Sequence, residues 1–258
     1  KVNHKFGDCD RLFLGFYRGK DHYRYDNEFS STPTISDITY QKDISQTRLN
    51  WGNLIGYTRW NHIFSNQLFS NFTVSYNQYR MSLNETSEDR TDYQGKLYDY
   101  HRYRSEFRSG IRDWSLRADF DFTPSTRHHI RFGSEFIHHL FTPGVSTSHI
   151  GNINDGSARQ DTTYATSSNL PQRGMELSLY GEDNWEATGR FSLNLGIRAS
   201  LFHTQGKNYL SAQPRISARY DWGKGIATKA SYSCMAQYVH LLTATPFSMP
   251  TDLWVPIT

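Results

Sequence analysis

Two pairs of histidines, His128-His129 and His138-His139, are the residues of this sequence best placed to bind a metal. Both pairs lie in a stretch that is predicted to form one extended strand. Residues of equal parity on a strand, such as His129 and His139, project to the same face, but ten residues of strand span roughly 33 Å. Because that separation is far too large for shared coordination, these histidines are predicted to face an interface or a lumen.

No catalytic constellation is evident. The segment Asn152-Ile-Asn-Asp-Gly156 faintly matches the start of a calcium loop, but its glycine stands one position early and no bidentate glutamate follows. The acidic neighbours Glu182 and Asp183 are ordinary for a charged lumen. The sequence also contains no nucleophile elbow, no helical zinc pair and no phosphate loop. We therefore expect no enzyme, no cofactor and no metal site.

One segment, Tyr93–Arg104, interleaves tyrosines with basic residues, as some nucleic-acid-binding surfaces do. Nearby acidic residues cancel much of this charge, and the formal net charge of the whole chain is only +3. These acidic residues are Glu85, Glu88, Asp89 and Asp92. We therefore expect no nucleic-acid partner and interpret the segment as a tyrosine-rich outer loop or barrel rim.

Hydropathy excludes a membrane helix of ordinary length. The mean hydropathy is -0.71, the apolar share is 36%, and no run of 18 or more apolar residues occurs. A membrane β-barrel remains possible because only alternate residues of its strands are apolar. The aromatic content of 15% favours strands and membrane interfaces over helices.

The stretch Gly189–Phe202 shows the strand pattern most clearly. From 191 to 201 its odd positions carry Phe, Leu, Ile or Ala, and its even positions carry Ser, Asn, Gly or Arg. The same period of two predicts about nine strands and no helix in the chain. These strands are predicted near residues 12–25, 46–62, 68–83, 106–122, 128–141, 175–186, 190–203, 210–222 and 226–239.

In two of these strands, at 112–122 and 212–222, one parity is strongly polar and the other is apolar and ends in Trp or Phe. The charged face must contact water, and the apolar face with terminal aromatics is typical of a membrane barrel. A large soluble sheet with one solvated side could show the same layout. The residues predicted to line a lumen are Arg117, Asp119, Arg198, Arg215 and Arg219. The residues predicted to face lipid are Leu116, Phe120, Leu193, Leu195, Ile197 and Ile216.

The predicted connections alternate in length, as they do in outer-membrane barrels, where successive connections emerge on opposite sides of the bilayer. Short ones at 64–67, 123–126, 187–189 and 223–225 alternate with long ones at 26–45, 84–105 and 142–174, and the brief 204–209 is the exception. The polar segment 144–174 is interpreted as a mobile outer loop that could contact a ligand. The predicted fold is an all-β, antiparallel up-and-down transmembrane β-barrel, present as an incomplete segment of about nine strands.

Short sequence stretches in a fixed order carry a family resemblance in the last third of the chain. They are Tyr180-Gly-Glu-Asp-Asn-Trp-Glu186, Phe191-Ser-Leu-Asn-Leu-Gly-Ile-Arg-Ala-Ser200, Pro214-Arg-Ile-Ser-Ala-Arg-Tyr220, Lys229-Ala-Ser-Tyr-Ser233, Gln237-Tyr-Val-His-Leu-Leu242 and Pro250-Thr-Asp-Leu-Trp-Val-Pro256. Together they resemble the barrel of TonB-dependent outer-membrane receptors, especially those of Bacteroides-like bacteria. The first two thirds fit this family in rhythm only.

The resemblance implies a barrel of about 22 strands that is closed by an N-terminal plug and energised by the TonB complex through a short box. Residues 1–258 would be part of the β-barrel domain of a larger receptor, and the plug domain and the remaining strands would lie outside this sequence. The start at Lys1 without a signal peptide and the abrupt end at Thr258 fit this expectation.

The implied location is the outer membrane of a Gram-negative cell, and the implied partners are outer-membrane lipid, the receptor's own plug, the TonB complex and a small-molecule nutrient. The implied function is active import of a nutrient such as a ferric siderophore, another metal chelate, a cofactor or a glycan. Two alternatives remain open at this point. They are a passive porin-like outer-membrane barrel and a soluble secreted β protein that binds glycans.

Overall fold

The computed structural model describes residues 1–33, 37–154, 158–165, 171–244 and 251–256. Within these ranges the regular secondary structure consists of β-strands. The described residues include no helix that is long and apolar enough to span a membrane. The all-β prediction is confirmed. The strands are β1 (Val2–Lys5), β2 (Asp10–Ser31), β3 (Ile38–Ser65), β4 (Leu68–Tyr93), β5 (Lys96–Ser125), β6 (His128–Asn154), β7 (Ala158–Ala165), β8 (Gln172–Glu186), β9 (Phe191–Thr204), β10 (Lys207–Gly223), β11 (Ile226–Ser233), β12 (Val239–Ala244) and β13 (Thr251–Pro256).

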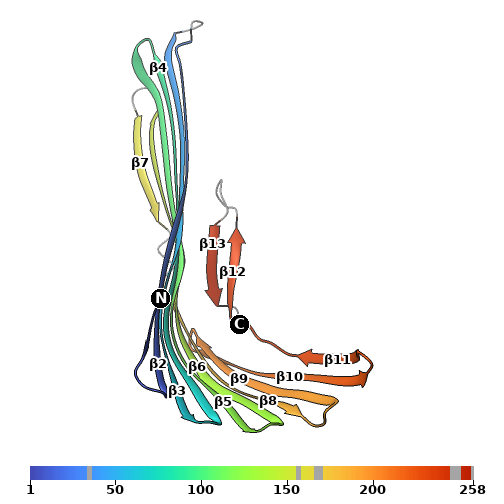
Figure 1. Cartoon of the computed structure of the whole chain (residues 1–258). Coiled ribbons are helices and arrows are strands. Elements are labelled where there is room, and N and C mark those ends of the chain that lie inside the picture. Colours follow the sequence, from blue (N-terminus) through green and yellow to red (C-terminus); the bar gives the residue numbers. More distant parts are fainter. Residues whose placement is uncertain (34–36, 155–157, 166–170, 245–250, 257–258) are drawn as a thin grey trace.

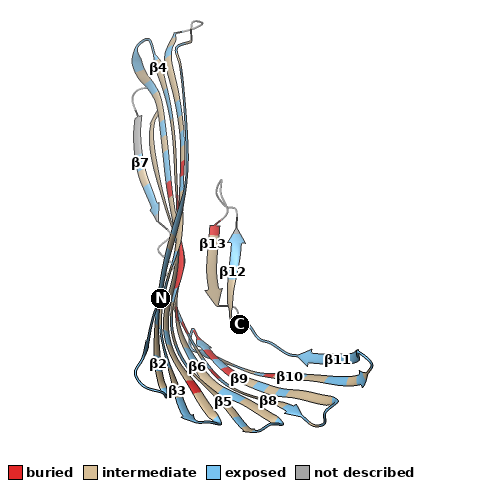
Figure 2. Cartoon of the chain, viewed as in Figure 1, coloured by how far each residue is buried: buried red, intermediate tan, exposed pale blue. Residues whose placement is uncertain are grey.

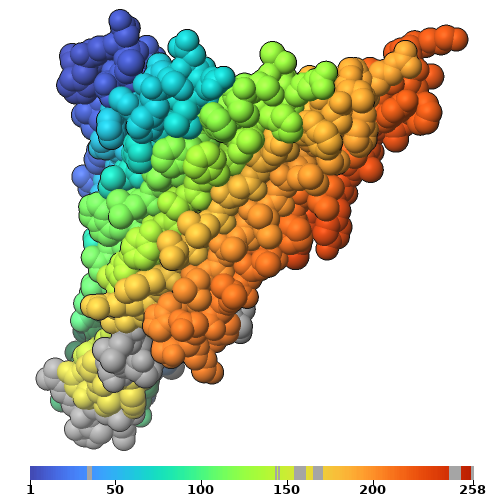
Figure 3. Space-filling view, turned by 90° about the horizontal axis from the view of Figure 1, so that it is seen from below, coloured from blue at the N-terminus to red at the C-terminus, as the bar shows by residue number. Residues whose placement is uncertain are grey.

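Consecutive strands pair in antiparallel, up-and-down order, as predicted. The main sheet has 11 strands and follows the order β1-β2-β3-β4-β5-β6-β8-β9-β10-β11, while β7 pairs with β6 off this path. Figure 3 shows these strands side by side in chain order, from blue to red. Each of the nine predicted strands corresponds to one strand of this sheet.

The sheet is taller at its N-terminal side than at its C-terminal side. Strands β2 to β6 have 22 to 30 residues, whereas β8, β9 and β10 have 14 to 17. In Figure 1 the long strands extend to the top of the view, and at the bottom the sheet curves through β8 to β11. We call the edge with the turns between β3 and β4, β5 and β6, and β8 and β9 the short-turn edge, and the opposite edge the tall edge.

The prediction of long connections at the tall edge was wrong, because most residues of those segments lie in strands. Segment 26–45 holds the ends of β2 and β3, segment 84–105 holds parts of β4 and β5, and segment 142–174 holds part of β6, all of β7 and the start of β8. Residues 34–36, 155–157 and 166–170 lie outside the described residues. Each added residue pair extends a ladder of backbone hydrogen bonds that is already formed below it, so polar sequence can continue as strand.

Tight turns allow the strands to continue to the tall edge. Gln94 and Gly95 have φ of 48° and 76°, and Gln205 and Gly206 have φ of 51° and 75°. Two consecutive residues with positive φ produce the turn twist that matches a pair of antiparallel strands. A two-residue turn therefore replaces the long loop predicted at 84–105.

The last predicted strand, at 226–239, was too long. Strand β11 ends at Ser233, where Cys234 N–H still donates to the Pro214 carbonyl at 3.0 Å, and the chain then leaves the sheet. It returns as the hairpin of β12 and β13, which lies within the concave side of the curved sheet (Figure 1). The cysteines Cys9 and Cys234 are free and exposed.

Few side chains are buried, as Figure 2 shows by the scarcity of red segments. The described apolar residues that are buried are Met81, Leu83, Ile111, Phe141 and Phe202. A single-layer sheet leaves both of its faces accessible, so a buried cluster needs a second layer above it. Tyr238 and β13 contribute to that layer, with Tyr238 stacked on Phe202 at 4.8 Å between ring centroids.

Candidate functional site

The strand register separates the side chains into two faces, because residues directly opposite each other in an antiparallel pair point to the same side. Asp119 is opposite Gly133, Gly133 is opposite Tyr180, and Tyr180 is opposite Arg198. The same reasoning places all five residues predicted to line a lumen on one face, which we call the polar face. They are Arg117, Asp119, Arg198, Arg215 and Arg219.

The polar face is the concave face that β12 and β13 cover in part. Strand β13 contacts β4, β5 and β6, and Tyr238 reaches Ser200, which shares a parity with Arg198. Arg215 and Arg219 on the same face are exposed. The structure therefore brings the five predicted residues to one concave surface, and their exposure to a lumen stays a prediction.

An ion-pair network joins three strands in the middle of the polar face. The Arg198 guanidinium on β9 donates to Glu135 on β6 at 2.9 Å and to the Ser178 hydroxyl on β8 at 2.6 Å. It also lies 3.5 Å from Glu176. The Arg198, Glu135 and Glu176 side chains keep 25%, 19% and 16% of their exposure, so the network is partly shielded from water. Charge-assisted hydrogen bonds of this kind hold the arginine in a defined position.

A second cluster adjoins the first. Arg117 donates to Asp119 at 2.8 Å, and the Tyr180 hydroxyl donates to the same carboxylate at 2.5 Å. The other two predicted arginines are less constrained. Arg219 lies 3.8 Å from Asp221, and Arg215 forms no ion pair with any residue that the structure describes. The polar face thus combines fixed charges with charges that are available to a binding partner.

The histidines pair with aspartates on neighbouring strands instead of gathering around a metal. His128 lies 2.7 Å from Asp183, His129 lies 3.0 Å from Asp121, and His139 lies 2.8 Å from Asp113. His129 and His139 share the polar face, as their parity predicted. The described ranges contain no group of three residues that could hold a metal ion. Asp155 and Gly156 of the calcium-like segment lie outside those ranges.

The acidic neighbours Glu182 and Asp183 point to opposite faces. Glu182 lies on the polar face, 3.0 Å from Arg131. Asp183 lies on the other face, opposite Ile130 and Leu195, and its partner there is His128. Two carboxylates on opposite sides of a sheet cannot act on one substrate, so this pair forms no catalytic site.

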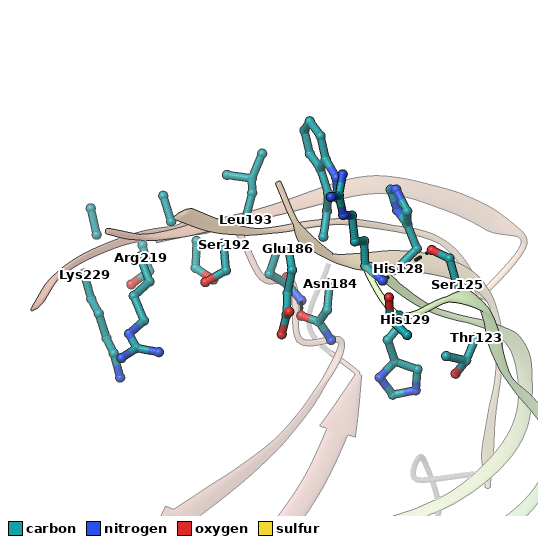
Figure 4. A pocket seen from close by; sticks show the side chains of 18 residues that line it. Thr123, Ser125, His128, His129, Asn184, Glu186, Ser192, Leu193, Arg219 and Lys229 are labelled. Carbon is teal, nitrogen blue, oxygen red and sulfur yellow. Dashed lines mark hydrogen bonds between the residues drawn. The ribbon is translucent and has the colours of Figure 1, made fainter. Parts of the chain in front are cut away.

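At the short-turn edge the polar face is hollowed. Figure 4 shows His129, Asn184, Glu186, Arg219 and Lys229 pointing to one side of the sheet, while Leu193 points to the other. The hollow therefore presents charges of both signs, which suits hydrogen bonding with water or a polar chain segment better than selection of one ion.

The opposite face, which we call the apolar face, carries all six residues predicted to face lipid. They are Leu116, Phe120, Leu193, Leu195, Ile197 and Ile216. Ile197 is 58% exposed and Leu116 is 53% exposed, and no other part of the described chain covers them. Exposed apolar side chains over several strands indicate a surface that another apolar phase or partner covers, and contact with lipid remains the prediction.

Aromatic rings bound the apolar face. Trp60, Phe72, Phe120 and Phe132 form a ladder across β3 to β6, with centroid distances of 5.3, 5.8 and 5.1 Å. Tyr76 and Trp114 form a second pair toward the tall edge, at 4.8 Å. On β5 every second residue from Phe122 to Trp114 is apolar, and the next residue of that parity is Arg112. These eight residue steps span about 27 Å along the strand, similar to the ~25 Å apolar band of outer-membrane barrels.

Sequence reasoning missed an apolar patch on the polar face, nearer the tall edge. It consists of Tyr79, Met81, Leu83, Ile111, Phe141 and Phe202. The hairpin of β12 and β13 lies on part of it, where Asp252 N–H donates to the Met81 sulfur at 3.2 Å. The sequence does contain a signal for this patch. At alternate positions of β4 the polar Asn77 is followed by Tyr79 and Met81.

Beyond the apolar band, ion pairs and hydrogen bonds join the tall strands. The Tyr93 hydroxyl donates to Asp37 at 2.6 Å, and this hydrogen bond raises the pKa of Tyr93. Glu28, 2.7 Å from Lys42, raises the pKa of that lysine.

Acidic residues also pair with the basic residues of this region. Arg102 lies 3.8 Å from Glu88, and Arg90 donates to Asp92 at 2.8 Å. The acidic residues therefore do offset basic charge here, as the sequence indicated. The segment from Tyr93 to Arg104 is the end of β4, a two-residue turn and the start of β5, so it is not a long loop.

One family of known proteins matches most of this chain. The family model for the TonB-dependent receptor-like β-barrel matches residues 6–233. Among solved structures, the FpvAI-pyocin S2 complex matches with 10% identity over 86% of this chain and 42% of that chain, at a TM-score of 0.37. The ferric yersiniabactin uptake receptor FyuA from Yersinia pestis matches with 11% identity over 87% of this chain and 49% of that chain, at a TM-score of 0.21.

The chain spans less than half the length of these two solved structures. No curated protein matches it. The family model alone covers most of the sequence, including every strand from β2 to β11. The chain therefore belongs to the TonB-dependent receptor-like β-barrel family.

Proposed function

We propose that this chain is part of the barrel wall of an outer-membrane receptor that actively imports a scarce nutrient with energy delivered through TonB. The observation that carries this proposal is the opposition of the two faces on one sheet. An exposed apolar band with aromatic edges lies on one side, and a network of charges lies on the other. A wall between lipid and an aqueous lumen requires both.

In this mechanism the nutrient first meets the tall strands, which rise beyond the apolar band. It then passes along the polar face when the receptor's own plug is displaced by the TonB complex. Ion pairs hold Arg117 and Arg198 in the wall. Arg215 and Arg219 are less constrained, so they are the arginines best placed to contact the plug or the nutrient. The nutrient is a ferric siderophore, another metal chelate, a cofactor or a glycan.

Uptake by the full-length receptor in its native cell tests this proposal. A deletion strain is compared with the parent on each nutrient class as the limiting source, with and without an uncoupler of the proton motive force. We expect the deletion to abolish growth on one class and the uncoupler to abolish uptake of the same compound.

Two results would contradict the proposal. Uptake that depends on the receptor but persists with the uncoupler indicates a passive porin-like barrel. Recovery of the receptor as a secreted, detergent-free protein indicates a soluble glycan-binding sheet.

A further inference from the structure

Charge is segregated between the two faces of the tall strands, from the row of Trp51 and Met81 toward the tall edge. In β2 to β5 this region comprises residues 21–31, 41–51, 81–91 and 99–109, and the register places its odd positions on the polar face. The lysines and arginines of these ranges all stand at even positions, and they are Arg24, Lys42, Arg48, Arg90, Arg102, Arg104 and Arg108. The polar face carries carboxylates instead, from Asp21, Asp43, Glu85, Asp89 and Asp99. We call this part of the polar face the acidic wall.

The carboxylates of the two faces differ in their partners. Those on the apolar face form ion pairs with a lysine or an arginine, and they are Asp26, Glu28, Glu88 and Glu106. On the acidic wall the side chains of Asp21, Asp43 and Asp89 are exposed and form no ion pair or hydrogen bond with a described residue. Asp43 and Asp89 are directly opposite each other on β3 and β4, an arrangement in which like charges repel. Their charge is therefore not compensated from within the described chain.

Aromatic rings and an unsatisfied hydroxyl accompany these carboxylates. Tyr23, Tyr25 and Phe29 on β2 face the same side and are 40%, 47% and 57% exposed. The faces of such rings attract ammonium and guanidinium groups. Ser105 is 2% exposed and lies opposite Glu85, and its hydroxyl oxygen has no hydrogen-bond partner within the described ranges. The acidic wall thus offers negative charge, aromatic faces and an unused hydrogen-bonding group, all of which suit a ligand with cationic donors.

The carboxylates recur along the strands with the repeat of an extended chain. Successive rows of one face are two residues apart, or about 6.8 Å. Asp21 lies in the row of Met81, and Glu85 lies two rows nearer the tall edge. Asp43 and Asp89 lie two rows beyond Glu85. An extended peptide that runs along the strands places its alternate side chains at the same spacing, so basic residues at every second position can reach these rows.

We propose that the acidic wall binds a free basic peptide in extended conformation, by charge-assisted hydrogen bonds from its lysines or arginines to the carboxylates. The inference rests on the proposed function, which puts the tall edge outside the cell, and it adds a class of ligand to those named above. The backbone groups of β3 and β4 are already paired within the sheet, so the peptide is held by its side chains. A compact ligand with one positive charge would reach one row only, whereas the carboxylates from Asp21 to Asp89 extend over about 27 Å.

Fluorescence anisotropy of labelled peptides with the purified full-length receptor in detergent tests the binding. The probe is a short peptide in which lysine alternates with serine. One control peptide is the same after acetylation of its lysines, which removes the charge and keeps the length. The other control has the same composition with all lysines in one block, so that only half of them face one side when the chain is extended.

Two receptor variants locate the binding. The test variant combines Asp21→Asn, Asp43→Asn and Asp89→Asn on the acidic wall. The matched variant makes the same change in charge on the apolar face of the tall strands, by combining Asp26→Asn, Glu28→Gln and Glu88→Gln. Because Asp43 and Asp89 repel each other, the test variant should unfold no earlier than the unaltered receptor, so a loss of binding cannot be ascribed to a loss of folding.

We expect the receptor to bind the alternating peptide more tightly than the block peptide, and the acetylated peptide least. The test variant should lower the affinity for the alternating peptide about fivefold or more, because three charge-assisted contacts are lost together. The matched variant should stay within about twofold of the unaltered receptor, since its exposed charges lie on the other face.

Four results would overturn the inference. Equal affinity for the charged and acetylated peptides would exclude recognition of positive charge, and equal affinity for the alternating and block peptides would exclude the extended arrangement. An unchanged affinity of the test variant, or an equal loss in both variants, would exclude the acidic wall as the site. The proposed function is judged separately, by membrane fractionation and uptake. A receptor that transports its nutrient with energy from the proton motive force but binds none of these peptides refutes only the peptide site.

Discussion

The Tyr79 hydroxyl donates a hydrogen bond of 2.5 Å to Asp252 across a sequence separation of 173 residues. This bond ties β4 in the wall to β13 in the returning hairpin. The Trp254 ring packs edge-on against Tyr79, with centroids 6.0 Å apart. The two contacts explain how a six-residue strand pair is held against a surface that is otherwise open.

Loss of the Tyr79 hydroxyl should release this hairpin. We expect Tyr79→Phe to speed hydrogen exchange in β12 and β13 about tenfold or more, because a hydrogen bond to a carboxylate contributes roughly 1.5–3 kcal/mol. Exchange mass spectrometry of the full-length receptor measures the effect. Tyr76→Phe on the apolar face is the matched control and should leave exchange in the hairpin unchanged. Equal exchange in Tyr79→Phe and the unaltered receptor would show that the bond does not hold the hairpin.

Adjacent residues of one strand should report opposite surroundings. In a receptor with Cys9→Ser and Cys234→Ser, a nitroxide placed at Ile216 should collide more with oxygen than with a nickel chelate, and one at Ser217 should show the reverse. Oxygen partitions into lipid and the chelate stays in water. Electron paramagnetic resonance of the full-length receptor in liposomes makes the measurement. A label at Ile216 that is accessible chiefly to the chelate would refute the assignment of the apolar face to lipid.

The Arg198 and Glu135 pair should stabilise the wall cooperatively. Each single change, Arg198→Gln or Glu135→Gln, should lower the free energy of unfolding by about 1–2 kcal/mol, since the pair is partly shielded from water. The double variant should cost less than the sum of the two, because neither charge is then left without its partner. Denaturant unfolding in detergent tests this, with Arg215→Gln as the control for an arginine without an ion pair. Strict additivity would mean that the two side chains do not interact.

The two glycines Gly110 and Gly56 should differ in their tolerance of a methyl group. Gly110→Ala places Cβ against the Tyr79 carbonyl oxygen, so β4 and β5 must separate locally, at a cost of about 1–3 kcal/mol. Gly56→Ala meets nothing within 4 Å and should change stability little. Unfolding midpoints of the two variants, measured side by side, decide this. Equal midpoints would contradict the close approach of the strands at Gly110.

The hydrogen bond from Tyr93 to Asp37 should be visible in a pH titration. Ionisation of the phenol breaks this bond and places two negative charges together, so the pKa of Tyr93 lies above its ordinary value of 10.0. Because the folded pKa is the higher one, the contribution of the bond to stability is complete below about pH 10 and is lost as the pH rises through the folded value. Asp37→Asn should lower the pKa of Tyr93 towards its ordinary value.

Nuclear magnetic resonance of ring-labelled tyrosine in the full-length receptor measures this pKa, and Tyr93→Phe identifies the resonance. A Tyr93 pKa that does not change in Asp37→Asn would exclude the carboxylate as the cause.

The sequence by itself determined that this protein is a two-faced antiparallel sheet. A strand places successive side chains on opposite faces, so the alternation from Phe191 to Leu201 sorts residues without any knowledge of their neighbours. The same periodicity assigned Arg117 and Leu116 to opposite sides, and the register agrees. The periodicity could not show which strands continue beyond the length that crosses a membrane. Pairing in that region depends on the backbone partners of each strand and not on alternation.

Only the tertiary structure decided which residues from distant parts of the chain meet. No local sequence pattern links Tyr79 to Asp252. They meet because the chain bends after Ser233 and thereby sets the position of the hairpin of β12 and β13. Likewise, Lys20 on β2 and Arg80 on β4 share a row only because both strands pair with β3, where Gly52 lies between them. Local chain stereochemistry fixes which way a side chain points, whereas the long-range pairing of strands determines what it meets.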